Sequence, residues 1–426
     1  MEYLKKDIGS YKLHLIKTKK FKTITVRVTF RTPIVKDEIT IRNILCDMFT
    51  QSSKNYPSKR DLTIKAQDLY SIDITTSNTR LGNYNNMNFY LSSLNDKYTE
   101  TDNFKNALEF FSEIIFNPDI NNNKFNKEKL DIVKTACKNT LLSIKEDTTN
   151  YSLIRLFETM DKNRPSSYRM VGYLDDLEKI NEDNLYTYYK QMLKTNLVDI
   201  FVIGDIDFLE ITDLIRQNFK LKTLKKQRVP YILEDVKVKS KRLIAKEEIT
   251  SNQSKLAIGC RLSSLTDYER NYPLTLYNII LGGGTDSKLF QEVREKNSLC
   301  YVINSVPNKL DNLIIIRAGI DKSNYQKVLT LIDKILVDMK KGKFTEENIN
   351  KAKEFYNTAL DEVEESQNSI INNYYMSELI GTDSLEVKRE KIAKVTKEEI
   401  VKVAKKVKSD TIFLLEGNEE NNNVEV

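Results

Sequence analysis

The stretch LGGGTDSKLFQEVREKNSLCYVINSV, residues 281–306, carries the most specific pattern in this 426-residue chain. Gly282, Gly283 and Gly284 follow an apolar helical pattern, which predicts a helix C-cap and a loop that reverses the chain. No G-K-[ST] follows the glycines, so this loop is not a phosphate-binding loop. The polar run around Arg294 predicts a surface helix, and Tyr301 falls in a strand-like segment.

Strands and helices are predicted on both sides of this stretch. In the second half, strands are expected at 242–249, 254–262, 299–306, 313–320 and 411–417, and helices at 267–281, 323–341, 345–380 and 396–406. In the first half, strands are expected at 11–17, 24–31, 70–77, 87–94 and 198–207, and helices at 38–51, 101–116, 125–160, 176–193 and 208–219.

An offset of about 200 residues superimposes the order of elements in the two halves. This repeat predicts an α+β fold of two homologous α/β-sandwich domains, each a mainly antiparallel sheet covered by helices on one face, in a clamshell arrangement. The domains are expected at 1–220 and 242–418. A basic linker at 221–241 contains Pro230 and lacks a helical period, and a disordered tail is expected at 419–426.

Composition narrows the class of function. Lysines and arginines exceed acidic residues by 67 − 61 = 6, but the basic residues are scattered, so no nucleic-acid partner is expected. The N-terminal segment has no apolar core of signal-peptide length and no later run approaches a membrane span, so we expect a cytoplasmic protein without a membrane partner. Cys46, Cys137, Cys260 and Cys300 lie far apart, which argues against disulfides and thiolate metal sites.

One histidine, His14, is present, so the chain cannot build a histidine-based zinc centre of its own. A nucleophilic dyad of His14 with a cysteine would need a thiolate of low pKa beside the imidazole. A histidine within a short strand is more often structural, and we assign His14 no catalytic role.

Two segments resemble the pitrilysin/insulinase metallopeptidase family, which includes the mitochondrial processing peptidases. Residues 281–306 resemble the signature of that family's second domain, with the glycines, S-x-L-F, V-R-E and Tyr301 at the family spacing. Residues 164–207 resemble the end of its first domain. The resemblance covers nearly the whole chain and implies the two-domain repeat.

The resemblance also shows which residues of the active site are replaced. Active members carry H-x-x-E-H on the first helix, where two histidines bind zinc and the glutamate is the general base. Counting back from Tyr56 and Pro57 places these positions at Asn43, Cys46 and Asp47. An amide is a poor zinc ligand, and Cys46 cannot replace a carboxylate as general base at its usual pKa.

A third zinc ligand, a glutamate on a later helix, is also replaced. Lys138, Asn139 and Thr140 lie near its expected position. The chain is therefore expected to have no catalytic residues, no metal and no cofactor of its own.

Arg294 and Tyr301 match the spacing of an Arg/Tyr pair that active members use on the substrate. An arginine fork can hold a peptide carbonyl or carboxylate, and a tyrosine hydroxyl can stabilise an oxyanion. The resemblance thus implies a non-catalytic subunit that pairs with an active, zinc-bearing homologue and supplies these substrate-binding residues to a shared chamber for peptide processing.

Three alternatives remain open from the sequence. The chain could be a stand-alone peptide-binding or scaffold protein, or it could form a homodimer instead of a heterodimer. A hydrolase that uses Cys46 and Asp47 is the third.

Overall fold

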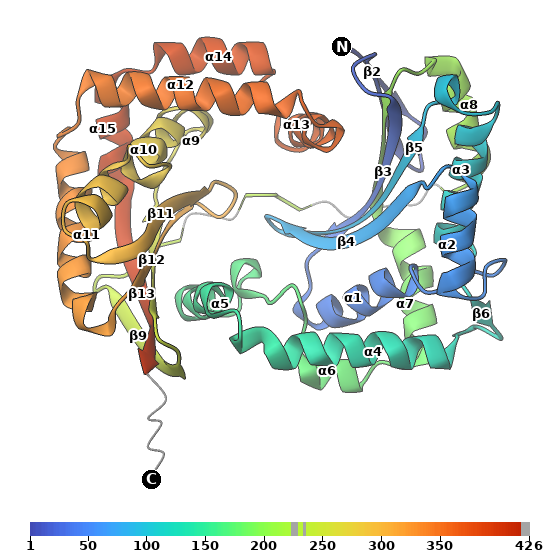
Figure 1. Cartoon of the computed structure of the whole chain (residues 1–426), viewed down its shortest axis with the longest axis horizontal. Coiled ribbons are helices and arrows are strands. Elements are labelled where there is room, and N and C mark those ends of the chain that lie inside the picture. The colour runs from blue at the N-terminus through green and yellow to red at the C-terminus, as the bar shows by residue number, and fades with distance from the viewer. Residues whose placement is uncertain (223–228, 233–235, 419–426) are drawn as a thin grey trace, which may run out of the picture. The chain divides into compact units, whose positions relative to one another are not determined.

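The computed structural model describes residues 1–222, 229–232 and 236–418. Both halves of the chain contain several strands and several helices (Figure 1). Contacts divide the chain into two compact units, whose bounds are Met1–Ser143, Arg169–Tyr231 and Glu365–Tyr375 for unit 1, and Ile144–Tyr168, Ile232–Glu364 and Met376–Val426 for unit 2. The predicted disordered tail and residues 223–228 and 233–235 of the predicted linker lie outside the described residues.

Unit 1 contains a six-stranded sheet in the order β1-β2-β8-β3-β5-β4. Neighbouring strands are antiparallel except β2 and β8, which are parallel. The strands are β1 Glu2–Asp7, β2 Lys12–Lys17, β3 Thr23–Pro33, β4 Asp73–Leu81, β5 Tyr84–Leu94 and β8 Leu197–Gly204, and a small hairpin joins β6 Ile120–Asn121 to β7 Lys124–Phe125.

Apolar side chains alternate along these strands and put one apolar face toward a helical layer. Val26, Val28 and Phe30 of β3 belong to this core, together with Ile200 and Val202 of β8. The helices of unit 1 are α1 Ile39–Met48, α2 Lys59–Asp68, α3 Asn103–Phe116, α4 Lys127–Leu142, α6 Leu174–Glu178, α7 Glu182–Thr195 and α8 Phe208–Asn218.

Unit 2 repeats this topology in a five-stranded sheet with the order β11-β12-β10-β13-β9. Its one parallel pair, β13 and β9, takes the place of β8 and β2, and the other pairs are antiparallel. The strands are β9 Leu243–Thr250, β10 Ser254–Leu262, β11 Cys300–Asn308, β12 Leu313–Ile320 and β13 Val407–Asn418. The predicted repeat of a mainly antiparallel sheet with a helical layer is therefore confirmed.

The helices of unit 2 cover the apolar face of this sheet, where Ile258 and Ile316 meet Leu281 and Ile332. They are α9 Asp267–Asn271, α10 Pro273–Gly282, α11 Tyr325–Lys340, α12 Glu346–Val363, α14 Leu385–Lys394 and α15 Lys397–Lys406, with a π-helical turn at Phe290–Glu295.

Two long helices predicted from the sequence are each broken in the structure. The stretch 125–160 contains α4 and α5, Thr148–Met160, and a new N-cap at Asp147 starts the second helix by accepting a hydrogen bond from Asn150 N. The stretch 345–380 contains α12 and α13, Gln367–Ile380. The amphipathic pattern continues across the first break, so it did not reveal it, but the pattern is lost in α13.

Each break marks a place where the chain passes to the other unit. Helix α5 packs against β10 and β13 of unit 2, whereas residues 365–375 at the start of α13 belong to unit 1. The units therefore differ from the contiguous domains 1–220 and 242–418 by these exchanged segments. The prediction that helices cover only one face of each sheet was also wrong, because the exchanged helices cover part of the other face.

The elements that were not predicted include the strands β1, β6 and β7 and the helices α2 and α14, and the predicted helix 176–193 is divided into α6 and α7 at residues 179–181. The predicted helix 267–281 is divided into α9 and α10 at Tyr272, directly before Pro273. Proline disfavours helical geometry in the residue that precedes it, which accounts for the division.

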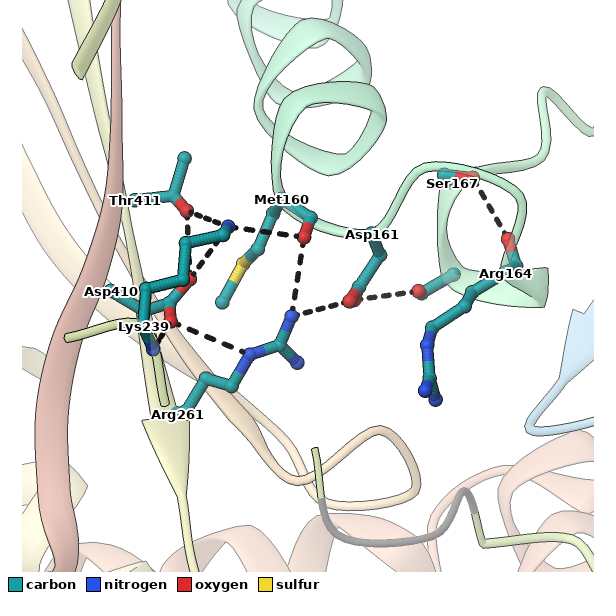
Figure 2. A network of polar contacts seen from close by, with 9 residues as sticks. Met160, Asp161, Arg164, Ser167, Lys239, Arg261, Asp410 and Thr411 are labelled. Carbon is teal, nitrogen blue, oxygen red and sulfur yellow. Dashed lines mark hydrogen bonds and ion pairs between the residues drawn. The ribbon is translucent and has the colours of Figure 1, made fainter. Parts of the chain in front are cut away.

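In unit 2 the exchanged helix covers a buried polar network (Figure 2). Arg261 of β10 forms an ion pair with Asp161 at the end of α5, and its Nε lies 3.8 Å from Asp410 Oδ1 on β13. Lys239 Nζ lies 3.2 Å from Asp410 Oδ2, and Ser166 Oγ donates to Asp161 Oδ2 at 2.8 Å. The buried guanidinium is thus held between two carboxylates.

A small residue at position 259 allows α5 to come close to this sheet. A Cβ atom at Gly259 would lie 2.4 Å from Met160 Sδ. A side chain here would therefore push against the thioether of Met160, the last residue of α5, which would have to change its side-chain conformation.

We predict that Asp161→Ala destabilises the chain by about 3 kcal/mol, because it leaves the buried Arg261 guanidinium with one distant carboxylate. Equilibrium denaturation in guanidinium chloride measures this change. The matched control is Asp267→Ala, which removes an exposed carboxylate from Arg270 and should cost less than about 1 kcal/mol. Equal effects of the two variants would contradict the role assigned to the network.

Candidate functional site

Helix α1 brings the three predicted motif positions to one pocket in unit 1. Asn43 and Asp47 are four residues apart and lie on the same helical face, while Cys46 points partly into the core. The pocket has a volume of about 380 Å³. Its lining consists of Asn43, Cys46, Asp47, Thr76, Ser77, Asn78, Ala136, Cys137, Thr140, Met170 and Val171.

The region expected to supply the third ligand reaches the same pocket, though with different residues. Thr140 of α4 lines it, and Lys138 and Asn139 do not. Ala136 and Cys137, one turn earlier on the helix, also line it and were not singled out from the sequence. The helical period gives the signal that was missed, because residues three and four positions before Thr140 share its face.

The Asn43 carboxamide links three segments of the chain. Its Oδ1 accepts a hydrogen bond from Asn78 Nδ2 of β4 at 2.6 Å, and its Nδ2 donates to the carbonyl oxygen of Met170. Thr76 Oγ1 also donates to the Cys46 carbonyl oxygen at 3.3 Å. Hydrogen bonds thus connect α1 to β4 and to the segment before α6.

The pocket does not fit the zinc ion that the family resemblance implies. Both polar atoms of Asn43 are engaged, and the residue that lines the pocket near the expected third ligand is Thr140, a residue type that ordinarily does not ligate zinc. Among the residues that the structure describes, no group of three or more His, Cys, Asp or Glu side chains is placed to hold a metal ion.

The thiols of the pocket are poor nucleophiles. Burial raises the pKa of Cys46 to about 12 and that of Cys137 to about 11, and the nearby Asp47 carboxylate adds to both shifts. Partial desolvation also raises the pKa of Asp47. A thiolate is the reactive form of cysteine, so this environment opposes a hydrolase based on Cys46 and Asp47.

Arg294 and Tyr301 lie in unit 2 on consecutive elements. Arg294 is in the π-helical turn, 44% exposed, with its guanidinium 4.7 Å from the centre of the Phe290 ring. Tyr301 is in the edge strand β11, 58% exposed, and its hydroxyl lies 3.3 Å from Asp321 Oδ1. Both side chains are thus accessible to a ligand.

The three glycines end α10 and begin the loop, with Gly282 as the last helical residue and Gly283 as the C-cap. Gly283 has a φ of −85°, so the cap does not use the left-handed conformation. A Cβ atom at Gly282 would lie 2.6 Å from the backbone nitrogen of Ser305. Gly282 therefore lets α10 pack closely against β11.

His14 is buried on the polar face of the unit 1 sheet. Its ring stacks on Phe201 at 4.1 Å, its Nδ1 forms a 2.7 Å hydrogen bond with the Tyr3 hydroxyl, and its Nε2 lies 3.5 Å from Asp199 Oδ1. Burial alone would raise the pKa of Asp199, but His14 and Arg31 lower it overall. All four cysteines are free and buried.

Native-state alkylation tests the thiol environment. We predict that iodoacetamide at pH 8 leaves Cys46 and Cys137 unmodified in the folded chain and modifies both after denaturation, as read by mass spectrometry.

The stability contributed by the neutral Cys46 thiol is present below its ordinary pKa of 9.0 and is lost as the pH rises toward about 12. Rapid, selective alkylation of folded Cys46 would contradict this assignment.

Comparison with known proteins finds similarity to one family of peptidases. The family model described as "Peptidase M16 inactive domain" matches residues 179–356. Over 98% of both chains, the sequence is 29% identical to the probable inactive metalloprotease YmfF of Bacillus subtilis (strain 168). It is 26% identical to the uncharacterized zinc protease YmxG of the same organism, over 64% of this chain and 65% of that one.

A solved structure shows the same fold over the whole length. The crystal structure of a conserved protein from Enterococcus faecalis V583 matches with a TM-score of 0.92 and 28% identity, and the match covers 99% of this chain and 100% of that chain. Within the described residues, no helix is both long and apolar enough to cross a membrane. The chain is therefore similar in sequence and fold to proteins of the peptidase M16 family, among them a probable inactive member.

Proposed function

We propose that this chain is the non-catalytic subunit of an M16-type zinc peptidase, paired with an active homologue that carries the zinc ion. In this proposal the chain contributes substrate-binding residues to a shared chamber for peptide processing, and the zinc ion belongs to the partner subunit only. The observation that carries the proposal is the contrast between a zinc position closed by hydrogen bonds and an exposed Arg294/Tyr301 pair.

The replaced zinc position supports the non-catalytic half of the proposal. Both polar atoms of the Asn43 carboxamide form hydrogen bonds, one to Asn78 and one to Met170. Burial raises the pKa of the Cys46 thiol and so keeps it neutral. A zinc peptidase needs three protein ligands and a group that activates the bound water. This pocket offers neither.

Exposure of Arg294 and Tyr301 supports the substrate-binding half. A guanidinium with one weak ion pair, 3.7 Å from Glu295, retains N–H groups for a peptide carbonyl or carboxylate. The Tyr301 hydroxyl makes a long hydrogen bond to Asp321 and remains open to a second partner. These groups bind and orient a peptide without performing chemistry on their own.

A relative among the matched proteins, YmxG, is named a zinc protease, so the family includes chains of the kind that the proposed partner requires. Copurification with a tagged copy of this chain is the direct test of pairing. Recovery of a homologue with an intact H-x-x-E-H motif supports the heterodimer. A chain that purifies without such a homologue favours a stand-alone peptide-binding protein or a homodimer.

We predict that Arg294→Ala and Tyr301→Phe each lower kcat/KM of the reconstituted complex for a peptide substrate by about tenfold or more, without changing its assembly. Peptide cleavage assays give the rates, and size-exclusion chromatography reports assembly. Loss of a group that binds the transition state lowers the rate, whereas the exposed positions of both residues leave folding unaffected.

Arg60→Ala and Tyr98→Phe serve as matched controls, because both residues are exposed and lie in unit 1, outside the pocket lining. Cleavage at the wild-type rate is expected for both. If Arg294→Ala and Tyr301→Phe are also silent in an active complex, the pair has only a surface role and the substrate-binding half of the proposal is wrong.

A further inference from the structure

The pocket at Asn43, Cys46 and Asp47 lacks the ligands for a zinc ion, but its side chains still enclose a cavity. Its volume of about 380 Å³ is far larger than the roughly 30 Å³ that a single water molecule occupies in the liquid. All of its lining residues belong to unit 1, so its shape is set within one compact unit. A pocket of this size accepts a side chain or a small organic molecule.

The formal charge in the lining of this pocket is negative. Among the described lining residues, Asp47 is the one that carries a formal charge, and its side chain is exposed. Within the described part of the chain, the Asp47 carboxylate has no cation as an ion-pair partner. An anion would be repelled here, whereas a cation would gain a partner.

Two helix ends strengthen this preference. Asp47 lies in the last turn of α1, which ends at Met48, and Thr140 lies in the last turn of α4, which ends at Leu142. The C-terminal end of a helix carries a partial negative charge from its unpaired carbonyl groups and attracts cations. Both helices therefore present their negative ends near the lining residues.

Several hydrogen-bond donors of the lining are already used. Asn78 Nδ2 donates to Asn43, Asn43 Nδ2 donates to Met170, and the Thr140 hydroxyl donates to the Ala136 carbonyl oxygen at 3.1 Å. Asn78 Oδ1, in contrast, is buried without a hydrogen-bond partner. The lining thus offers hydrogen-bond acceptors that have no donor, and it suits a ligand that donates hydrogen bonds.

The remaining walls are apolar. Ala136, Met170 and Val171 line the pocket together with the neutral thiols of Cys46 and Cys137. Such walls suit a chain of methylene groups that ends in a charged group, because the stem is buried while its head finds acceptors. A bare metal cation would leave most of this surface without contacts, and the donor set for it is lacking.

We propose that this pocket binds a primary alkylammonium group, with the ammonium at Asp47 and the alkyl stem along Cys137, Met170 and Val171. Two kinds of ligand carry such an alkylammonium group, namely a peptide with a lysine side chain and a small free alkylamine. The site needs no zinc ion and no partner subunit, so it is tested on the isolated full chain and stands or falls independently of the heterodimer.

Ligand-observed NMR titration tests the site with three pentapeptides that share the frame acetyl-Ala-Ala-X-Ala-Ala-amide, in which X is lysine, Nε-acetyl-lysine or norleucine. n-Butylammonium is the fourth probe. We expect saturable binding of the lysine peptide, of n-butylammonium or of both, and at least tenfold weaker binding of the two neutral peptides. The lysine peptide binding more tightly than n-butylammonium identifies a peptide as the source, and the reverse order identifies a free amine.

Asp47→Asn removes the charge at nearly constant volume and should weaken binding of the charged probes on the order of tenfold, the contribution typical of one charge-assisted hydrogen bond. Asp213→Asn, at an exposed aspartate of α8 in the same unit, is the matched control and should bind as the wild type does. Equal binding of lysine and norleucine peptides to the wild-type chain overturns the proposal, as does absence of binding by every probe at millimolar concentration. Unchanged affinity in Asp47→Asn overturns it as well.

Discussion

A buried arginine–aspartate pair, on the face of each sheet opposite the main helical layer, constrains the rest of this structure. In unit 1, Arg31 Nη2 lies 3.1 Å from Asp199 Oδ2, and in unit 2, Arg261 Nε lies 3.8 Å from Asp410 Oδ1. In both sheets the arginine comes from the strand next to the one that carries the aspartate. Burying such charges is costly unless further polar groups surround them.

Those further groups come from helices contributed by the other half of the sequence. Asp161 follows α5 and pairs with Arg261, and the centre of the Tyr375 ring of α13 lies 5.9 Å from the Arg31 guanidinium. Gln367 of α13 also donates to the Thr23 carbonyl oxygen at 2.9 Å. Each sheet is therefore completed by a helix that is distant in sequence, which explains why the compact units are discontinuous and why the chain folds as a pair of interdependent halves.

The same polar chemistry defines the candidate site. In a zinc peptidase of this fold, a metal ion would tie the first helix to its surroundings. Here the Asn43 carboxamide makes that connection through Asn78 and Met170. Within the described residues, the nearby Asp47 carboxylate has no ion-pair partner, and this is the basis of the proposed binding of a cationic group. The replaced zinc position and the proposed ammonium site thus share one pocket.

Much of the fold was predictable from the sequence because strands such as β3 and β8 alternate or are apolar throughout, and the two halves share one order of elements. The register of Asn43, Cys46 and Asp47 rested on the family resemblance, and the structure brings these three residues to one pocket. The break before α5 was not predictable from periodicity, since α5 is amphipathic like the segment before it, whereas the loss of the amphipathic pattern from Gln367 onward was a signal that the sequence reading missed. The arginine–aspartate pairs were not predicted either. Strand pairing determines which charged residues lie side by side, and the sequence alone does not reveal which strands pair.

The zinc content of the isolated chain tests the central claim most directly. The chain is incubated with excess zinc, dialysed, and measured by plasma mass spectrometry, with thermal melts before and after addition of a chelator. The account predicts far less than one zinc ion per chain and a melting temperature that the chelator does not change. One tightly bound zinc ion per chain, lost on Asn43→Ala together with a fall in melting temperature, would contradict it.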